Sequence, residues 1–122
     1  MTCVNIHRSD DTSDDIDPLP EQRGGTGRAA VCNGLLFVVG GETSVEANST
    51  LGIDESKTYV RVDIYDPVAN LWTRGPDLPK GMHGHYPVTH YDPATRQSRI
   101  YIAGGGVKAQ KSKSDLFISL RC

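Results

Sequence analysis

The sequence lacks the features that mark several broad classes of protein. No apolar run approaches the ~18 residues that a membrane span needs, and the first eight residues lack the apolar core of a signal peptide. No long stretch repeats its apolar residues with the 3.6-residue period of a helix. We therefore expect a soluble chain with almost no helix and no association with a membrane.

An excess of charge of either sign is also missing. The 122 residues carry 13 Lys and Arg against 15 Asp and Glu, which gives a net charge of -2. A protein that binds nucleic acid or an acidic membrane surface without sequence preference needs a clear basic excess. We therefore expect no nucleic acid among the partners.

Cysteine is scarce, with only Cys3, Cys32 and Cys122. Three cysteines cannot all pair, and no C-x-x-C spacing occurs, so the sequence predicts neither a disulfide framework nor a zinc site. Free thiols favour a reducing compartment, and we expect a cytoplasmic protein. The N-glycosylation sequon Asn48-Ser49-Thr50 supports the alternative of a secreted protein, should Asn48 carry a glycan.

The residues that are plentiful indicate an all-β protein. Thirteen Gly and seven Pro separate short runs of Val, Ile and Tyr. The apolar run 35–39, closed by Gly40-Gly41, predicts a strand buried on both faces. Residues 60–65 alternate instead, with the apolar side chains on one face and Arg61 and Asp63 on the other, as expected of a strand nearer an edge.

The chain contains a repeated pattern. Leu19-Pro20 leads through a β segment into Gly40-Gly41, and Leu78-Pro79 leads through a second β segment into Gly104-Gly105. The units differ in one turn, where Asn33-Gly34 predicts a two-residue hairpin and the second unit has a longer connection. The expected strands cover residues 27–32, 35–39, 60–65 and 71–73 in the first unit, and 86–91, 99–103 and 116–120 in the second.

We divide the chain accordingly. Residues 1–18 form an N-terminal edge strand near residues 4–6 followed by an acidic loop, residues 19–80 form the first unit, and residues 81–122 form an incomplete second unit. The acidic loop lacks the alternating ligands and central Gly of a calcium site, so we expect it to be a solvated run of like charges.

Repeats of four short strands, with a Gly pair after the second strand and spaced Tyr and Trp afterwards, are typical of propeller blades. The pattern resembles the kelch family in Val39-Gly40-Gly41, Tyr65 and Trp72, and again in Ala103-Gly104-Gly105. The resemblance implies two kelch-type blades, each a four-stranded antiparallel sheet, the second without its own outer strand. Glycine would let aromatic rings of outer strands and the next blade approach the backbone.

Two blades are too few to close a propeller. An isolated pair therefore leaves two apolar blade faces exposed to water. The chain is therefore either a fragment of a longer propeller, which is the interpretation we favour, or a unit that self-associates through its exposed faces. One route to self-association would have the strand near residues 4–6 complete the last blade of another copy.

Strand direction sorts the loops between the two ends of the blades. The acidic loop and residues 22–23, 42–57, 80–83 and 108–113 fall at one end, and kelch propellers commonly bind partners through loops on that face. The resemblance therefore implies a non-catalytic protein–protein interaction module that binds a protein or peptide there. The candidate partner-binding residues are Arg23, Arg28, Glu42, His83, His85 and Lys108.

The alternative is a fragment of a galactose-oxidase-like enzyme or of a carbohydrate-binding propeller. The copper-radical chemistry of the former needs a Tyr cross-linked to Cys and His and Tyr ligands from several blades, which two blades do not supply. His83 and His85 lie on one side of a strand but have no third ligand spaced nearby. We expect no catalytic residue, no metal ion and no cofactor.

Overall fold

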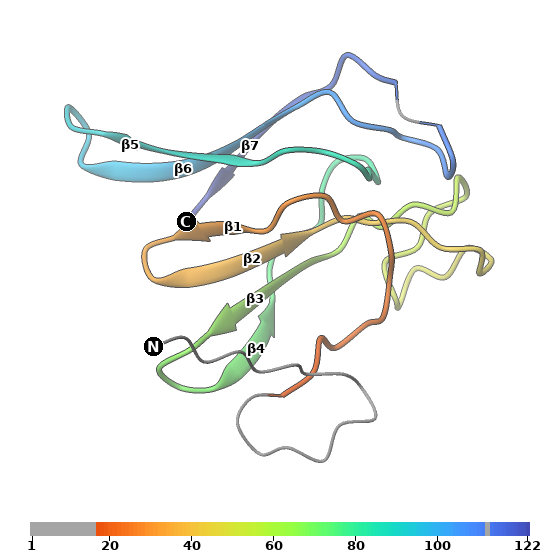
Figure 1. Ribbon diagram of the computed structural model, residues 1–122, viewed down its shortest axis with the longest axis horizontal. Helices are drawn as coiled ribbons and strands as arrows, with labels where there is room; N and C mark the ends of the chain where they lie inside the picture. Colours follow the sequence, from red (N-terminus) through yellow and green to blue (C-terminus); the bar gives the residue numbers. More distant parts are fainter. Residues whose placement is uncertain (1–16, 112) are drawn as a thin grey trace, which may run out of the picture.

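The computed structural model describes residues 17–111 and 113–122, and within these residues every regular element is a β-strand (Figure 1). The all-β expectation is confirmed. The predicted edge strand near residues 4–6 and most of the acidic loop lie outside the described residues. No helix in the described part of the chain is long and apolar enough to cross a bilayer.

The first sheet contains four antiparallel strands in chain order. They are β1 (Ala30–Cys32), β2 (Leu35–Val39), β3 (Val62–Asp66) and β4 (Leu71–Arg74). Asn33 and Gly34 join the first two with φ of 53° and 77°, the pair of positive values that a type I′ hairpin requires. The predicted tight hairpin is therefore confirmed, as is the apolar strand β2 that follows it.

The second sheet contains three antiparallel strands, also in chain order. They are β5 (Val88–Asp92), β6 (Gln97–Ala103) and β7 (Phe117–Arg121). The β5–β6 turn is the longer one that the sequence predicts, and its start is fixed by Asp92, whose Oδ1 accepts a hydrogen bond from the Ala94 amide at 2.9 Å. The described residues add no fourth strand beside β7.

The two sheets lie one over the other and enclose the core between them (Figure 1). Phe37, Val39 and Val62 from the first sheet and Ile100 and Ile102 from the second belong to one buried cluster. Because side chains alternate along a strand, the opposite face of β6 points away from the first sheet. On that face Tyr101 stacks on Phe117 with ring centroids 6.0 Å apart, and Phe117 is 68% exposed.

The segment that links β4 to β5 passes directly over the first glycine pair. The Gly41 amide donates to the carbonyl oxygen of Met82 at 2.8 Å, and a Cβ atom on Gly40 would clash with that same oxygen. A Cβ atom on Gly27 would likewise clash with the carbonyl of His85. The expected approach of a ring from the second unit is met at Gly40 by the imidazole of His85, whose Cε1 would lie 3.2 Å from a Cβ atom there, and the backbone of the linking segment approaches more closely still.

Two of the cysteines form a disulfide. Cys32, at the end of β1, pairs with Cys122, and their Cα atoms are 5.9 Å apart. The expectation of free thiols is therefore wrong for these two residues. Their separation of 90 residues offers no spacing signal, and only the stacking of the two sheets brings them together.

Candidate functional site

Three long connections meet at one end of the molecule, opposite the short hairpin turns (Figure 1). They are the β2–β3, β4–β5 and β6–β7 connections. The Ala109 amide donates to the carbonyl oxygen of Ser56 at 2.9 Å, and His83 and Gly106 exchange two backbone hydrogen bonds at 2.8 and 2.9 Å. Loops from the two sheets are thus joined into one surface, which we call the loop end.

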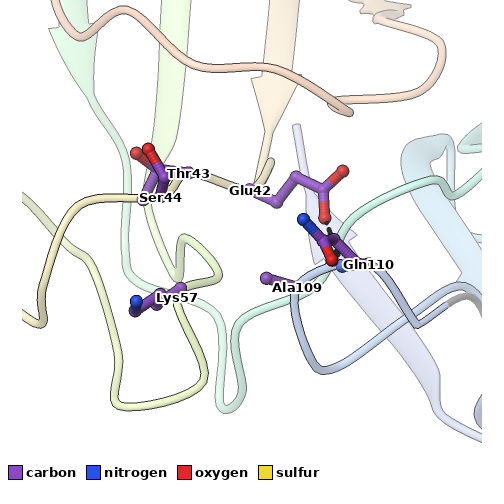
Figure 2. Close-up of a pocket in the computed structure, with 6 residues that line it drawn as sticks. All are labelled: Glu42, Thr43, Ser44, Lys57, Ala109 and Gln110. Atoms are coloured by element: carbon purple, nitrogen blue, oxygen red, sulfur yellow. Dashed lines mark hydrogen bonds between the residues drawn. The ribbon is translucent and has the colours of Figure 1, made fainter.

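A pocket of about 500 Å³ opens at the loop end. Glu42 points toward Gln110 on one side of it, and Lys57 lies on the other side, with Ala109 between them (Figure 2). The Gln110 amide donates to Oε2 of Glu42 at 2.8 Å. The remaining lining comes from Thr43 and Ser44. The pocket therefore offers one carboxylate, one ammonium group and two hydroxyl groups to a ligand.

Asp54 fixes the shape of the β2–β3 connection beside this pocket. Its Oδ1 accepts hydrogen bonds from the Ser56 amide at 2.9 Å, from the Thr58 amide at 3.1 Å and from the Thr58 hydroxyl at 2.9 Å. Thr58 is completely buried. A carboxylate that accepts several hydrogen bonds holds a loop in one conformation, so this side of the pocket is formed before any ligand arrives.

The structure brings three of the six predicted site residues together. Nε2 of His83 donates to the carbonyl oxygen of Lys108 at 2.8 Å, and Nδ1 of His83 lies 3.5 Å from Oε2 of Glu42. His83 is 5% exposed, so it supports the loop end from below. Glu42 lines the pocket, and Lys108 is exposed but is not one of the lining residues. The sequence places these residues on the same set of loops, and the structure shows that they are in contact.

His85 takes a different place. Its ring is buried at 1% exposure, and neither ring nitrogen makes a hydrogen bond to any of the described residues. Burial lowers the pKa of the imidazole, while the nearby carbonyl groups of Val39 and His83 act in the opposite direction without hydrogen-bonding geometry. His85 is therefore an interior residue between the two sheets and has no surface to offer a partner.

Arg23 is also interior. Its side chain is fully buried, with Nη2 2.6 Å from Oδ2 of Asp63 and the guanidinium carbon 5.3 Å from the centroid of the Tyr59 ring. Arg61 donates from Nε to the same Asp63 oxygen at 2.9 Å. Asp63 is itself fully buried, although it lies on the face of its strand opposite the apolar side chains.

Arg28 is exposed but lies away from the loop end. It lines a separate shallow pocket with Ala30 of β1 and Val88 of β5. The loop-end pocket residues Thr43, Ser44, Lys57 and Gln110 all lie in loops that the sequence assigns to that end. The sequence does not single them out, because the shape of each loop depends on contacts with the other sheet. Among the described residues, no group of three or more His, Cys, Asp and Glu side chains could hold a metal ion.

Residues 27–79 match the family model of the kelch motif, and this stretch includes all four strands of the first sheet. These residues form a kelch repeat. A search for similar curated proteins found no match. The two sheets are accordingly kelch-type propeller blades: the first blade comprises β1–β4 and the second blade comprises β5–β7.

Proposed function

We propose that this chain is a non-catalytic module that binds a protein or peptide partner at its loop end. Kelch repeats generally mediate protein interactions, and the repeat here supplies the general class. The observation that carries the specific proposal is the joining of loops from the two blades around one pocket through the Ala109–Ser56 and Gln110–Glu42 hydrogen bonds. A rigid scaffold that presents preformed loops is well suited to recognition.

The chemistry of the pocket indicates what kind of peptide it would accept. Glu42 and Lys57 lie on opposite sides of the opening, so a partner needs a cationic and an anionic group at a matching distance. The Lys57 ammonium lies 3.4 Å from the exposed carboxylate of Glu46 and can exchange that weak contact for one with a partner. We therefore propose a mixed-charge segment as the ligand, and binding should weaken as salt is added.

A matched pair of charge reversals tests this proposal. Lys57 lines the pocket, whereas Arg96 lies in the β5–β6 turn at the opposite end of the blades. Both residues have a positive φ, 60° and 57°, so Lys57→Glu and Arg96→Glu impose the same charge change on the same backbone conformation. The partner would first be captured with the wild-type chain from its natural source, and its affinity would then be measured by calorimetry.

We expect Lys57→Glu to weaken binding about tenfold or more, which corresponds to about 1.4 kcal/mol, and Arg96→Glu to leave the affinity unchanged. Equal affinities for the two variants would contradict the assignment of the loop end as the binding surface. Thermal unfolding of both variants controls for a loss of folded protein.

A further inference from the structure

The β2–β3 connection carries a motif that the proposed function does not use. Asn48, Ser49 and Thr50 form an N-glycosylation sequon, and all three residues are exposed. Along the chain, the sequon follows the pocket residues Thr43 and Ser44, and it is not part of the pocket lining. An oligosaccharide transferase could therefore reach it without disturbing the core.

The local geometry leaves the reactive atom of Asn48 available. The backbone of Asn48 exchanges two hydrogen bonds with Ile53, both at 2.9 Å, which closes a tight turn. Within this turn Oδ1 of Asn48 accepts from the amides of Thr50 at 3.1 Å and Leu51 at 3.3 Å. Within the described part of the chain, only the carboxamide oxygen of this side chain is engaged in hydrogen bonds. A glycan attaches to Nδ2 and leaves that oxygen in place, so the turn is compatible with the modified side chain.

An independent feature of the molecule points to the same cellular environment. The Cys32–Cys122 disulfide is of the kind that persists in oxidising compartments and is rare in the cytosol. The expectation of a cytoplasmic location rested on free thiols, and for these two cysteines that premise is removed. Asparagine-linked glycans are found on surface loops of secreted proteins, which acquire their disulfides along the same route.

We propose that Asn48 carries an N-linked glycan. The donor would be an oligosaccharide attached to a lipid through a diphosphate. A bond forms between Nδ2 of Asn48 and the anomeric carbon of the first sugar, the bond from that carbon to the diphosphate oxygen breaks, and the lipid diphosphate leaves. The amide nitrogen loses one proton, which passes to the leaving diphosphate or to water, and no atom is oxidised or reduced. This modification does not depend on the loop end binding a partner.

The protein isolated from its natural source provides the first test. A digest would be treated with peptide N-glycosidase in ¹⁸O-labelled water, and the peptide that contains Asn48 would be sequenced by mass spectrometry. We expect position 48 to be recovered as ¹⁸O-labelled Asp, because the enzyme converts a glycosylated Asn to Asp. Recovery of unlabelled Asn48 in all of the protein would overturn the proposal.

Matched variants provide the second test, in secretory eukaryotic cells with the full chain directed to the secretory pathway. Thr50 contributes only backbone groups to the described turn, so Thr50→Val removes the sequon hydroxyl while the turn remains. We expect the enzyme-sensitive mass increase in wild type and in Ser49→Ala, and its complete loss in Thr50→Val. Absence of the increase in secreted wild-type chain, or its persistence in Thr50→Val, would contradict the proposal.

Discussion

The two blades fill the same repeat position in opposite ways. Val38 pairs with Asp63 in the first blade, and the equivalent pair in the second is Ile102 with Ile118. The isoleucines pack against the first blade, whereas Asp63 is covered by Arg23 from the segment that precedes β1. This face is therefore apolar in the second blade, where the first blade covers it, and ionic in the first blade, where the segment before β1 covers it.

The glycine pairs differ as well. Gly40 lies against the carbonyl of Met82, whereas a Cβ atom on Gly104 would meet only the carbonyl oxygen of Ser114, at an ordinary contact distance of 3.8 Å. Both glycines have positive φ, 66° and 73°. The first blade therefore needs glycine for its backbone conformation and for close approach, and the second needs it at this position for the conformation alone.

The largest effect should come from breaking the ionic face of the first blade. Asp63→Asn leaves the Arg23 guanidinium buried without an opposite charge, and we expect a loss of about 3–5 kcal/mol in the free energy of unfolding, measured by urea denaturation. A loss below about 1 kcal/mol would show that the ion pair does not stabilise the fold.

A triple variant sharpens the same contrast. Arg23→Met and Arg61→Met combined with Asp63→Leu remove all three charges that meet at Asp63 and give the first blade the apolar character of the second, and replacing a buried ionic cluster by well-packed apolar side chains is often neutral or stabilising. We expect this variant to lie within about 1 kcal/mol of wild type or above it. If it is as unstable as Asp63→Asn, the two faces are not interchangeable.

Substitutions of the glycines provide a second way to test the difference between the blades. Gly40→Ala combines a left-handed conformation, about 1–2 kcal/mol, with overpacking against Met82, about 1–3 kcal/mol. Gly104→Ala carries only the cost of the left-handed conformation. We therefore expect the free energy of unfolding to fall by about 2–5 kcal/mol for Gly40→Ala and by about 1–2 kcal/mol for Gly104→Ala. Equal losses in thermal or urea unfolding would show that the linking segment does not press on the first blade.

The disulfide is a covalent link between the blades, because it joins β1 to the residue after β7. We expect Cys122→Ser to lower the free energy of unfolding by about 2–4 kcal/mol. Wild-type protein treated with a reductant should show the same loss, and the variant itself should not respond to the reductant. A response of the variant would indicate that Cys32 pairs elsewhere.

The smallest effect concerns pH and the histidine buried between the blades. Burial lowers the pKa of His85 in the folded protein, whereas the unfolded imidazole takes up a proton near pH 6.5. The unfolded state therefore binds more protons, and the stability that neutral His85 supplies is lost as the pH falls below about 6.5.

The contribution of one such proton is at most about 1.4 kcal/mol per pH unit. We expect His85→Leu to reduce the slope of unfolding free energy against pH between about pH 6.5 and 5. An unchanged slope in His85→Leu would contradict the assigned burial.

The sequence predicted those parts of the fold that depend on local pattern. The apolar run of β2, the Asn33-Gly34 hairpin and the second glycine pair identified the repeat, because turn chemistry and strand period are local properties. The burial of Asp63 was not predicted, because alternation shows which face a residue occupies but not what covers that face. The Cys32–Cys122 pair and the contact of Lys57 with the pocket depend on how two blades stack, which no local pattern encodes.

The close docking of the linking segment on the first glycine pair is the contact on which the arrangement of the two blades depends. Amide hydrogen exchange of Gly41, measured by NMR on the whole chain, tests it directly, because this amide lies outside the strands and donates to Met82. We predict that Gly41 exchanges as slowly as the amides of β2. Exchange as fast as that of the exposed residues 44–47 would contradict the docking.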